Sequence, residues 1–423
     1  MTDKQDKLIP KLRFPEFKND GEWESYAIED LFEVRNGYTP SKSNPEFWER
    51  GTIPWFRMED IRQNGRILSD SIQHITPQAV KGTGLFPAYS IIVATTATIG
   101  EHALLIADSL ANQRFTFLTK RKSLDDKLDM MYFHQYMFIV DEWCKRNTNF
   151  GGLLSVNMSA FKKLRVPVPS IQEQKRIAEF LTSLDDLLTG TKSKLEQLKA
   201  HKKGLMQKLF PAPRKALPEY RFPEFNNGGI WNESTLGELG EAYSGLSGKN
   251  KEDFGHGDAE YITYMNVFSN PIVKSGLNQP IEIDRAQHQV QYGDVFFTIS
   301  SETPEEVGMS SVWLDNKANV YLNSFCFGFR LKKPFNYIYL SYYFRSPSFR
   351  KRITLLAQGI SRYNISKNKV LELVLQYPSL DEQERIASCL YSLDESINAC
   401  SQQGSTLVEQ KKGLIQRLFP TID

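Results

Sequence analysis

The sequence is poor in cysteine, has no long apolar run and carries almost balanced charge, and each absence excludes a class of protein. The 4 cysteines among 423 residues form no CxxC pair, so we expect neither a structural zinc site nor a disulfide-stabilised secreted fold. No stretch reaches the roughly 18 apolar residues of a membrane-spanning helix, and the charged start MTDKQDKLIPKLRF lacks the apolar core of a signal peptide. These features predict a cytoplasmic protein.

The charge balance limits how the chain can meet a polyanion. It holds 52 basic and 50 acidic residues, which gives a formal net charge of +2. A chain with so little excess charge attracts nucleic acid only through local clusters of Lys and Arg. Any nucleic-acid surface is therefore expected in particular loops, and the isolated chain is expected to bind DNA weakly.

Catalytic signatures are also missing. The sequence has no GxxxxGK[ST] phosphate loop, no GxGxxG after a strand, no HExxH and no Asn/Asp-Pro-Pro-aromatic methyltransferase motif. The 6 histidines are dispersed, and the adjacent acidic pairs Asp185-Asp186 and Glu305-Glu306 indicate solvated faces. We predict a non-catalytic protein without metal-binding or cofactor-binding residues. The alternative, an enzyme with an unrecognised site, predicts turnover by the isolated chain.

One long helical stretch occurs twice. PSIQEQKRIAEFLTSLD…KKGLMQKLFP covers residues 169–211, and PSLDEQERIASCLYSLD…KKGLIQRLFP covers residues 378–420, at a constant offset of 209. Each copy has a proline at its entrance and another at its end, as helix boundaries favour. A repeat at a fixed interval indicates a repeated architecture.

Both copies carry an apolar seam whose steps alternate between four and three residues, the heptad pattern of a coiled coil. The first seam is Ile177, Leu181, Leu184, Leu188, Thr191, Leu195, Leu198, Lys202, Leu205 and Leu209. The second is Ile386, Leu390, Leu393, Ile397, Cys400, Gly404, Leu407, Lys411, Leu414 and Leu418.

The two lysines of the seams predict the direction of pairing. Lys202 and Lys411 occupy equivalent positions, so a parallel pair in register would set two ammonium groups against each other in a desolvating seam. An antiparallel pair separates them and lets their stems reach water. We predict an antiparallel coiled coil with a pseudo-two-fold axis. The alternative is two surface helices, each packed on its own domain.

Larger blocks precede the helices and share their order of elements. PKLRFPEF from Pro10 is echoed by PEYRFPEF from Pro218. Strands are predicted in 53–61, 89–100 and 114–121 with a helix over 124–147, and the second block repeats this order over 259–267, 293–308, 323–333 and 336–357. We predict an α+β fold with two mixed α/β domains, 1–168 and 212–377 (the latter with its linker), separated by the helical stretches 169–211 and 378–423.

The predicted loops of both blocks are rich in side chains that suit base edges and phosphates. Most polar loop residues are simply solvated, but these gather in corresponding loops of the two blocks. In the first block they are Thr39, Ser41, Lys42, Arg57, Thr95, Thr96, Thr98 and Arg114. In the second they are Lys249, Asn250, Lys251, Tyr264, Asn266, Ser300, Ser301, Arg362, Tyr363 and Asn364.

The chain resembles the specificity subunits of type I restriction–modification systems over nearly its full length. The motifs that carry the resemblance are the two helical repeats with their Pro-x-x-x-Glu-Gln entrances, TPSKSNPEFWERGTIPWFRMEDI (39–61), and the strand starts NQRF (112–115) and LNSF (322–325). The second block has SGLSGKNKEDFGHG (244–257) in place of the TPSKxNPEFW pattern, so we expect it to prefer different bases.

The resemblance implies a function and partners. Such subunits bind a split, asymmetric sequence in double-stranded DNA and dock two methyltransferase subunits, and restriction subunits join the full complex. S-adenosylmethionine, ATP and Mg²⁺ are then expected on those partners. A stand-alone DNA-binding or anti-restriction protein on the same scaffold is the alternative, which co-purification with a methyltransferase subunit discriminates. A purely structural coiled-coil adaptor predicts no sequence-specific footprint.

Overall fold

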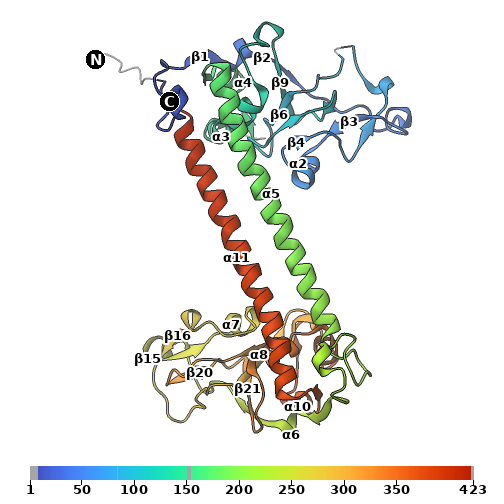
Figure 1. The fold of residues 1–423 in the computed structure, drawn as a ribbon, viewed down its shortest axis with the longest axis vertical. Coiled ribbons are helices and arrows are strands. Elements are labelled where there is room, and N and C mark those ends of the chain that lie inside the picture. The colour runs from blue at the N-terminus through green and yellow to red at the C-terminus, as the bar shows by residue number, and fades with distance from the viewer. Residues whose placement is uncertain (1–7, 83, 150–153, 421–423) are drawn as a thin grey trace. The chain divides into compact units, whose positions relative to one another are not determined.

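The computed structural model describes residues 8–82, 84–149 and 154–420. The chain forms two compact units (Figure 1): unit 1 is Met1–Thr191 with Gln403–Asp423, and unit 2 is Lys192–Gln402. Both boundaries fall inside the long helices α5 (Ile171–Lys208) and α11 (Leu380–Leu418). Each unit therefore takes part of both helices, and the domain boundaries given above remain a prediction.

Unit 1 is built on a five-stranded sheet of order β2-β9-β6-β7-β4 beside a three-stranded sheet of order β5-β3-β8. Its strands are β1 (Glu24–Ala27), β2 (Phe32–Asn36), β3 (Ile53–Phe56), β4 (Ile67–Leu68), β5 (His74–Ile75), β6 (Ser90–Ala94), β7 (His102–Leu105), β8 (Leu110–Ala111), β9 (Phe115–Lys120), β10 (Thr148–Asn149), β11 (Ser155–Val156) and β12 (Arg165–Val168). Its shorter helices are α1 (Ile28–Leu31), α2 (Met58–Asn64), α3 (Met130–Arg146) and α4 (Met158–Lys163).

Unit 2 repeats this plan, with a four-stranded sheet of order β14-β21-β17-β19 and a three-stranded sheet of order β16-β15-β20. Its strands are β13 (Asn232–Thr235), β14 (Gly240–Ser244), β15 (Phe254–Ile262), β16 (Gln279–Ile281), β17 (Val295–Thr298), β18 (Ser300–Ser301), β19 (Ser310–Val312), β20 (Val320–Leu322), β21 (Cys326–Leu331), β22 (Tyr363–Asn364) and β23 (Val374–Tyr377). Its shorter helices are α6 (Leu236–Leu239), α7 (Tyr264–Ser269), α8 (Tyr337–Tyr343), α9 (Pro347–Thr354) and α10 (Lys367–Leu371).

The two topologies correspond in the four strands β2-β9-β6-β7 and β14-β21-β17-β19, and in both three-stranded sheets. β3 pairs antiparallel with β5 and parallel with β8, and β15 pairs in the same two ways with β16 and β20. The prediction of one scaffold used twice is therefore confirmed. The helix predicted over 124–147 begins later, at Met130, and the one predicted over 336–357 is two helices, because Ser346 and Pro347 start a new N-terminus at α9.

The apolar seam is the protected face of both long helices. Every seam residue predicted above, from Ile177 to Leu209 and from Ile386 to Leu418, is buried or half-buried, whereas neighbours such as Glu196 and Lys412 are exposed. The heptad pattern thus located the packing face of each helix correctly. No helix in the described ranges is both long enough and apolar enough to cross a bilayer.

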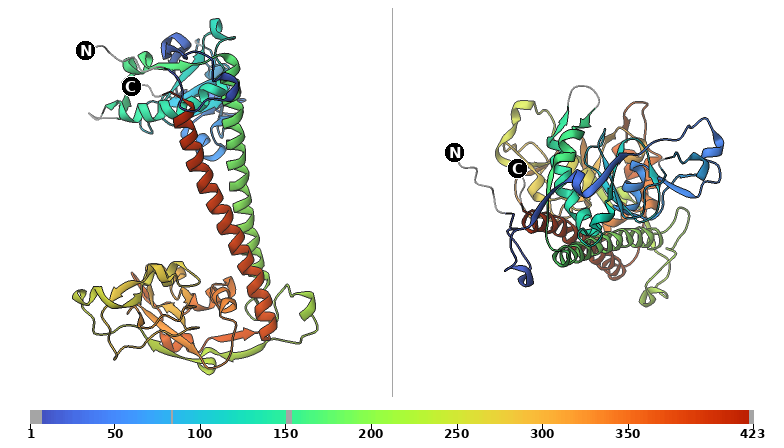
Figure 2. Two further views of the ribbon diagram at one scale, coloured as in Figure 1. Left: turned by 60° about the vertical axis from the view of Figure 1, so that its left-hand side comes forward. Right: turned by 90° about the horizontal axis from the view of Figure 1, so that it is seen from above.

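Within each unit the two helix segments run antiparallel. In unit 1, Ile415 and Leu418 near the end of α11 share one buried cluster with Ile177 and Leu181 near the start of α5, and Figures 1 and 2 show these segments side by side. In unit 2, Leu209 after the last turn of α5 shares a cluster with Ile386 near the start of α11. The predicted direction is confirmed inside both units.

The seam lysines do not extend to water as predicted. Lys411 Nζ lies 2.5 Å from Asp185 Oδ1, and Lys202 Nζ lies 2.6 Å from Asp394 Oδ1, so each ammonium pairs with a carboxylate of the other helix. The Lys411 side chain is only 7% exposed, and burial lowers the pKa of its ammonium group. Asp185, predicted to be solvated, also accepts a hydrogen bond from Gln135, because the helix pair brings both donors to it.

The two sequence motifs at the edges of each block meet in space. The guanidinium of Arg13, from the first RFPEF motif, forms two hydrogen bonds to Glu173, from the first Glu-Gln entrance, at 2.7 and 2.8 Å. Arg221 and Glu382 repeat this pair at 2.7 Å in unit 2. Both glutamate side chains are 1% exposed, so each needs its arginine: a buried carboxylate without a partner is costly.

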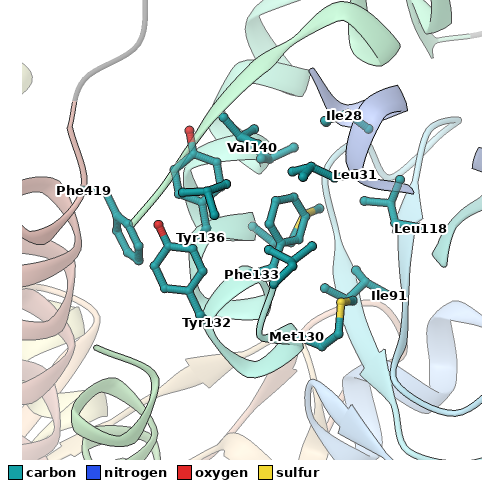
Figure 3. Packing of buried hydrophobic residues seen from close by; sticks show 14 of the residues in the cluster. Ile28, Leu31, Ile91, Leu118, Met130, Tyr132, Phe133, Tyr136, Val140 and Phe419 are labelled. Carbon is teal, nitrogen blue, oxygen red and sulfur yellow. The ribbon is translucent and has the colours of Figure 1, made fainter. Parts of the chain in front are cut away.

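The end of each helix repeat closes the core of a unit. Figure 3 shows Phe419 beside Tyr132 and Tyr136 of α3, with ring centroids 5.6 and 5.3 Å apart. Phe210 makes the equivalent contacts to Tyr339 and Tyr343 of α8, at 5.7 and 5.5 Å. The LFP ending of each repeat is therefore a core anchor as well as a helix stop.

Candidate nucleic-acid interface

In unit 1 the candidate loops meet at one end of the two sheets, which we call the recognition end of unit 1 (residues 37–44, 57–59, 95–98 and 112–114). Gly37 N–H donates to Phe115 O, and Asn112 N–H donates to Phe56 O. Thr95 N–H donates to Arg114 O at 3.1 Å. These bonds bring the loops that carry Thr39, Arg57, Thr96, Thr98 and Arg114 together.

The polar side chains of this end differ in availability. Lys42, Ser41 and Arg114 are exposed, and Thr96 and Arg57 are half-buried. The hydroxyl of Thr39 donates to Gln113 Oε1 at 2.5 Å. Thr95 is 6% exposed and its hydroxyl bonds to that of Thr116 at 2.9 Å, so its hydroxyl already has a partner within the fold, and the DNA contact expected of it stays a prediction.

The recognition end of unit 2 is formed by residues 245–251, 263–265, 299–301, 323–325 and 358–364. Leu246 N–H donates to Leu322 O, Asn323 N–H donates to Ile262 O, and Ile299 N–H donates to Phe325 O. Ser300 and Ser301 pair with Asn364 and Tyr363, and the Tyr264 hydroxyl donates to Ser300 O at 2.7 Å. Five separate loops therefore converge, and the backbone bonds donated by Asn323 and Ile299 match two of those in unit 1.

Three of the predicted residues at or beside this end have side chains that already bond to other residues of the protein. The Asn266 side chain is 1% exposed; it donates to Lys274 O and Asn278 Oδ1 and accepts from Lys274 N–H and Asn270. The fold thus gives the Asn266 amide four hydrogen bonds, and the base contact expected of Asn266 stays a prediction. Ser301 is 7% exposed and donates to Glu306.

Lys249 is the third, because it pairs with Asp284 at 2.8 Å. This ammonium group is the main cause that lowers the pKa of the Asp284 carboxyl to about 2. Asn250, Lys251, Arg362 and Asn364 are exposed, and Ser300 and Tyr363 are half-buried. The residues available to a ligand are thus a subset of those predicted.

Sequence reasoning missed the apolar part of this surface. Phe325 and Met265 are 59% and 60% exposed, and Ile360 in the loop before Arg362 is 96% exposed. The structure matches NQRF with NSFC (323–326), one residue later than the LNSF motif quoted above, because Asn112 and Asn323 are the equivalent turn residues. Asn-centred turn chemistry was the signal that could have found Phe325.

The described parts of these loops contain no metal centre. In residues 8–82, 84–149 and 154–420, no group of three or more His, Cys, Asp or Glu side chains is placed to hold an ion. The chemistry available at both ends is that of hydrogen-bond donors and acceptors, cationic groups and a few apolar faces. Such a surface contacts base edges and phosphates.

Two equivalent recognition ends on one repeated scaffold define a protein with two related recognition modules. The chain belongs to the family whose domain is described as the type I restriction modification DNA specificity domain, which matches residues 20–200 and 229–410. It is thus a specificity subunit of a type I restriction–modification system, a DNA-recognition component and not a catalytic one. The predictions of family, fold class and non-catalytic role are confirmed.

Individual relatives agree with this assignment. The chain is 49% identical over 162 residues to the type I restriction enzyme EcoprrI specificity subunit of Escherichia coli, covering 38% of this chain and 40% of that protein. It is 23% identical over 436 residues to the MjaVIII specificity subunit of Methanocaldococcus jannaschii, covering 96% of this chain and 93% of that protein. The chain thus spans about two-fifths of the first relative and nearly all of the second.

A solved structure agrees in fold. The type I restriction–modification S subunit from M. genitalium matches with a TM-score of 0.56 and 16% identity, covering 98% of this chain and 100% of that chain. At this identity the likeness shows the fold alone.

Proposed function

We propose that this specificity subunit binds a split, asymmetric target in double-stranded DNA, one half at each recognition end. In this proposal residues 1–168 and 212–377 act as target-recognition domains and the helical spacers 169–211 and 378–423 set the gap between the half-sites. Two methyltransferase subunits, which hold S-adenosylmethionine, dock on the chain. Restriction subunits, which use ATP and Mg²⁺, join them in the cleaving complex.

The observation that carries this proposal is the equivalence of the two recognition ends combined with their different side chains. The same backbone hydrogen bonds hold Arg114 in unit 1 and Phe325 in unit 2. One scaffold that presents different side chains at matched positions suits two half-sites of different sequence, since base edges differ in donors, acceptors and methyl groups.

The low net charge supports an assembly in which this chain selects the DNA sequence and its partner subunits add affinity for DNA. The net charge of +2 gives little long-range attraction to DNA, and few cations at the recognition ends, such as Lys42, Lys251 and Arg362, are exposed. Phosphate contacts supply much of the affinity of DNA-binding proteins. We therefore expect weak binding by the chain alone. The scarcity of cysteine, 4 in 423 residues, supports the reducing cytoplasm as its compartment.

The test is binding-site selection from random duplexes with the complex that co-purifies with this chain. The proposed function predicts a methyltransferase subunit in the complex and a split target with a fixed gap. A single continuous target, or sequence-specific binding by the chain without any methyltransferase partner, contradicts it. The second outcome would favour the stand-alone DNA-binding protein.

The helices offer a further test of the gap. Helix α5 has 38 residues and α11 has 39, and deletion of one heptad from each keeps the seam in register. Each helix becomes about 10 Å shorter, the length of about three base pairs, so we expect the selected gap to shorten.

Matched substitutions without a length change serve as the control for that deletion. Gly190 and Gly204 lie in α5, and a Cβ added at either meets nothing within 4 Å. The variant Gly190→Ala with Gly204→Ala should keep the original gap. An unchanged gap in the heptad-deleted chain, with methyltransferase binding intact, would show that the helices do not set the spacing.

A further inference from the structure

The two recognition ends share one turn, formed by residues 112–114 in unit 1 and 323–325 in unit 2. The side chain at the last position of this turn differs in chemistry between the units. In unit 1 the side-chain Oδ1 of Asn112 accepts from Arg114 N–H at 3.0 Å, and in unit 2 Oδ1 of Asn323 accepts from Phe325 N–H at 2.9 Å. The carbonyl of Arg114 accepts from Thr95 N–H, and that of Phe325 from Ile299 N–H. Positions 114 and 325 are therefore equivalent.

Both turns are fixed from below by close backbone packing. A Cβ added to Gly37 would lie 2.2 Å from Ala111 O, and one added to Gly245 would lie 2.0 Å from Asn323 O. Asn323 is 7% exposed and also donates from its Nδ2 to Ile262 O at 3.0 Å. The backbone that carries the side chain at position 114 or 325 is thus held rigidly. Discrimination between nucleobases requires such a fixed position.

The surroundings of the two positions differ in the same sense. Next to the turn, Arg57 and Glu59 begin α2 in unit 1, and Thr263 and Met265 occupy the equivalent places at the start of α7 in unit 2. Glu59 and Met265 are both exposed. One end therefore presents charged groups and the other presents exposed apolar groups around the equivalent turn.

We propose that position 114/325 determines specificity in both half-sites: Arg114 contacts a guanine, and Phe325 contacts the C5-methyl group of a thymine in the major groove. The inference rests on the proposed function. An arginine fork matches guanine O6 and N7, whereas a phenyl ring has no donor and suits the thymine methyl. Single exposed apolar residues are ordinary on proteins; the equivalence with Arg114 and the rigid turn are what single out Phe325.

The test uses modified bases in the target selected by the purified complex. Each thymine of the half-site assigned to unit 2 is replaced in turn by deoxyuridine, which removes only the methyl group. With the unaltered chain, one replacement should weaken binding about fourfold, the value of one buried methyl. With Phe325→Ala the same replacement should have no effect, because the contact is already lost.

Arg114 is tested in the same way in the other half-site. Replacing one guanine by 7-deazaguanine removes the N7 acceptor and should weaken binding about tenfold, and this effect should disappear in Arg114→Ala. The matched control is Ile230→Ala: Ile230 is 76% exposed in unit 2, but it lies two residues before β13 and belongs to none of the segments of the recognition end. This variant should keep every base effect of the unaltered chain.

The outcomes separate this inference from the function on which it rests. If the complex selects no split target, the proposed function fails. If it selects one, but no deoxyuridine effect depends on Phe325, the inference is wrong. Equal weakening by Phe325→Ala on thymine and deoxyuridine targets would indicate a ring inserted between base steps, which also overturns it.

Discussion

Units 1 and 2 agree in what they bury and differ in what they expose. Both contain an Arg–Glu pair at the start of a long helix and a Phe ring packed against two Tyr rings. Both also have a Gly packed against the backbone of the turn that carries position 114 or 325, the recognition turn. At the exposed positions around that turn, Arg114 and Glu59 in unit 1 correspond to Phe325 and Met265 in unit 2. The buried residues that stabilise the fold are distinct from the side chains predicted to recognise DNA. The predicted recognition side chains can therefore change without loss of the fold.

One buried site breaks the agreement. Unit 1 encloses His102 and His134, which are 0% and 2% exposed, with ring centroids 5.7 Å apart. The equivalent places in unit 2 are Ser310 and Ser341, each 1% exposed, and the histidines of unit 2, His201, His256 and His288, are exposed. The two units should therefore share their response to most core changes and differ in their response to acid.

The largest expected effect tests the shared entrance pair. Arg13→Ala in unit 1 and Arg221→Ala in unit 2 each leave a glutamate that is 1% exposed without its cation. We expect each change to lower the free energy of unfolding of its own unit by about 3–5 kcal/mol. Urea titrations read by pulsed hydrogen exchange and mass spectrometry report the units separately.

Each of these variants has a matched control. Arg176 pairs with Glu16 and Arg385 with Glu224, at side chains that are about half exposed. Alanine at either should cost at most about 1 kcal/mol. A large loss in one unit only would show that the two entrances are not equivalent.

The second effect tests the difference between the units. Burial lowers the pKa of His134 from 6.5 to about 4, and burial is also the main cause that lowers the pKa of His102. The neutral folded form is fully stable above pH 6.5, and this stability is lost as the pH falls towards 4, because the unfolded chain takes up the proton first. The pKa shift of His134 alone corresponds to a loss of about 3 kcal/mol in the free energy of unfolding between these pH values.

Unit 1 should therefore lose more stability than unit 2 between pH 7 and pH 4.5, in the same urea titrations. The double variant His102→Ser with His134→Ser carries the residues of unit 2 and should lose this extra dependence on pH, whatever its stability at pH 7. An extra acid loss of unit 1 that persists in the double variant would place its origin in other groups.

The smallest effect concerns the glycines under the recognition turns. Gly37→Ala and Gly245→Ala each force a backbone shift, which costs about 1–3 kcal/mol, and displace position 114 or 325. Each variant should weaken selection at its own half-site only. Gly21→Ala and Gly276→Ala, where a Cβ meets nothing within 4 Å, are the controls, and weakened selection at both half-sites by one substitution would contradict independent recognition ends.

Features that depend on residues close together in the sequence could be predicted from it. The 3.5-residue seam identified the protected face of α5 and α11, and the lysines at equivalent positions predicted the antiparallel direction correctly. The partners of those lysines could not be predicted, since Lys411 and Asp185 are 226 residues apart. The same holds for Arg13 and Glu173, 160 residues apart, although both motifs were recognised.

The candidate site was predicted less completely for a related reason. Residue type and loop position indicate which side chains suit DNA, but burial decides which of them are free. Asn266 and Thr95 have suitable side chains whose polar atoms are used inside the fold. Phe325 was overlooked because an apolar residue suggests a core position, and only its turn geometry places it at the surface.

The two recognition ends have equivalent backbone hydrogen bonds, and we predict that a pseudo-two-fold axis relates them. The most direct test is binding-site selection with a chain in which block 226–377 also replaces block 20–168, purified with its methyltransferase. A two-fold relation predicts an inverted repeat of one half-site across the original gap. A direct repeat, or retention of the original asymmetric target, would contradict the account.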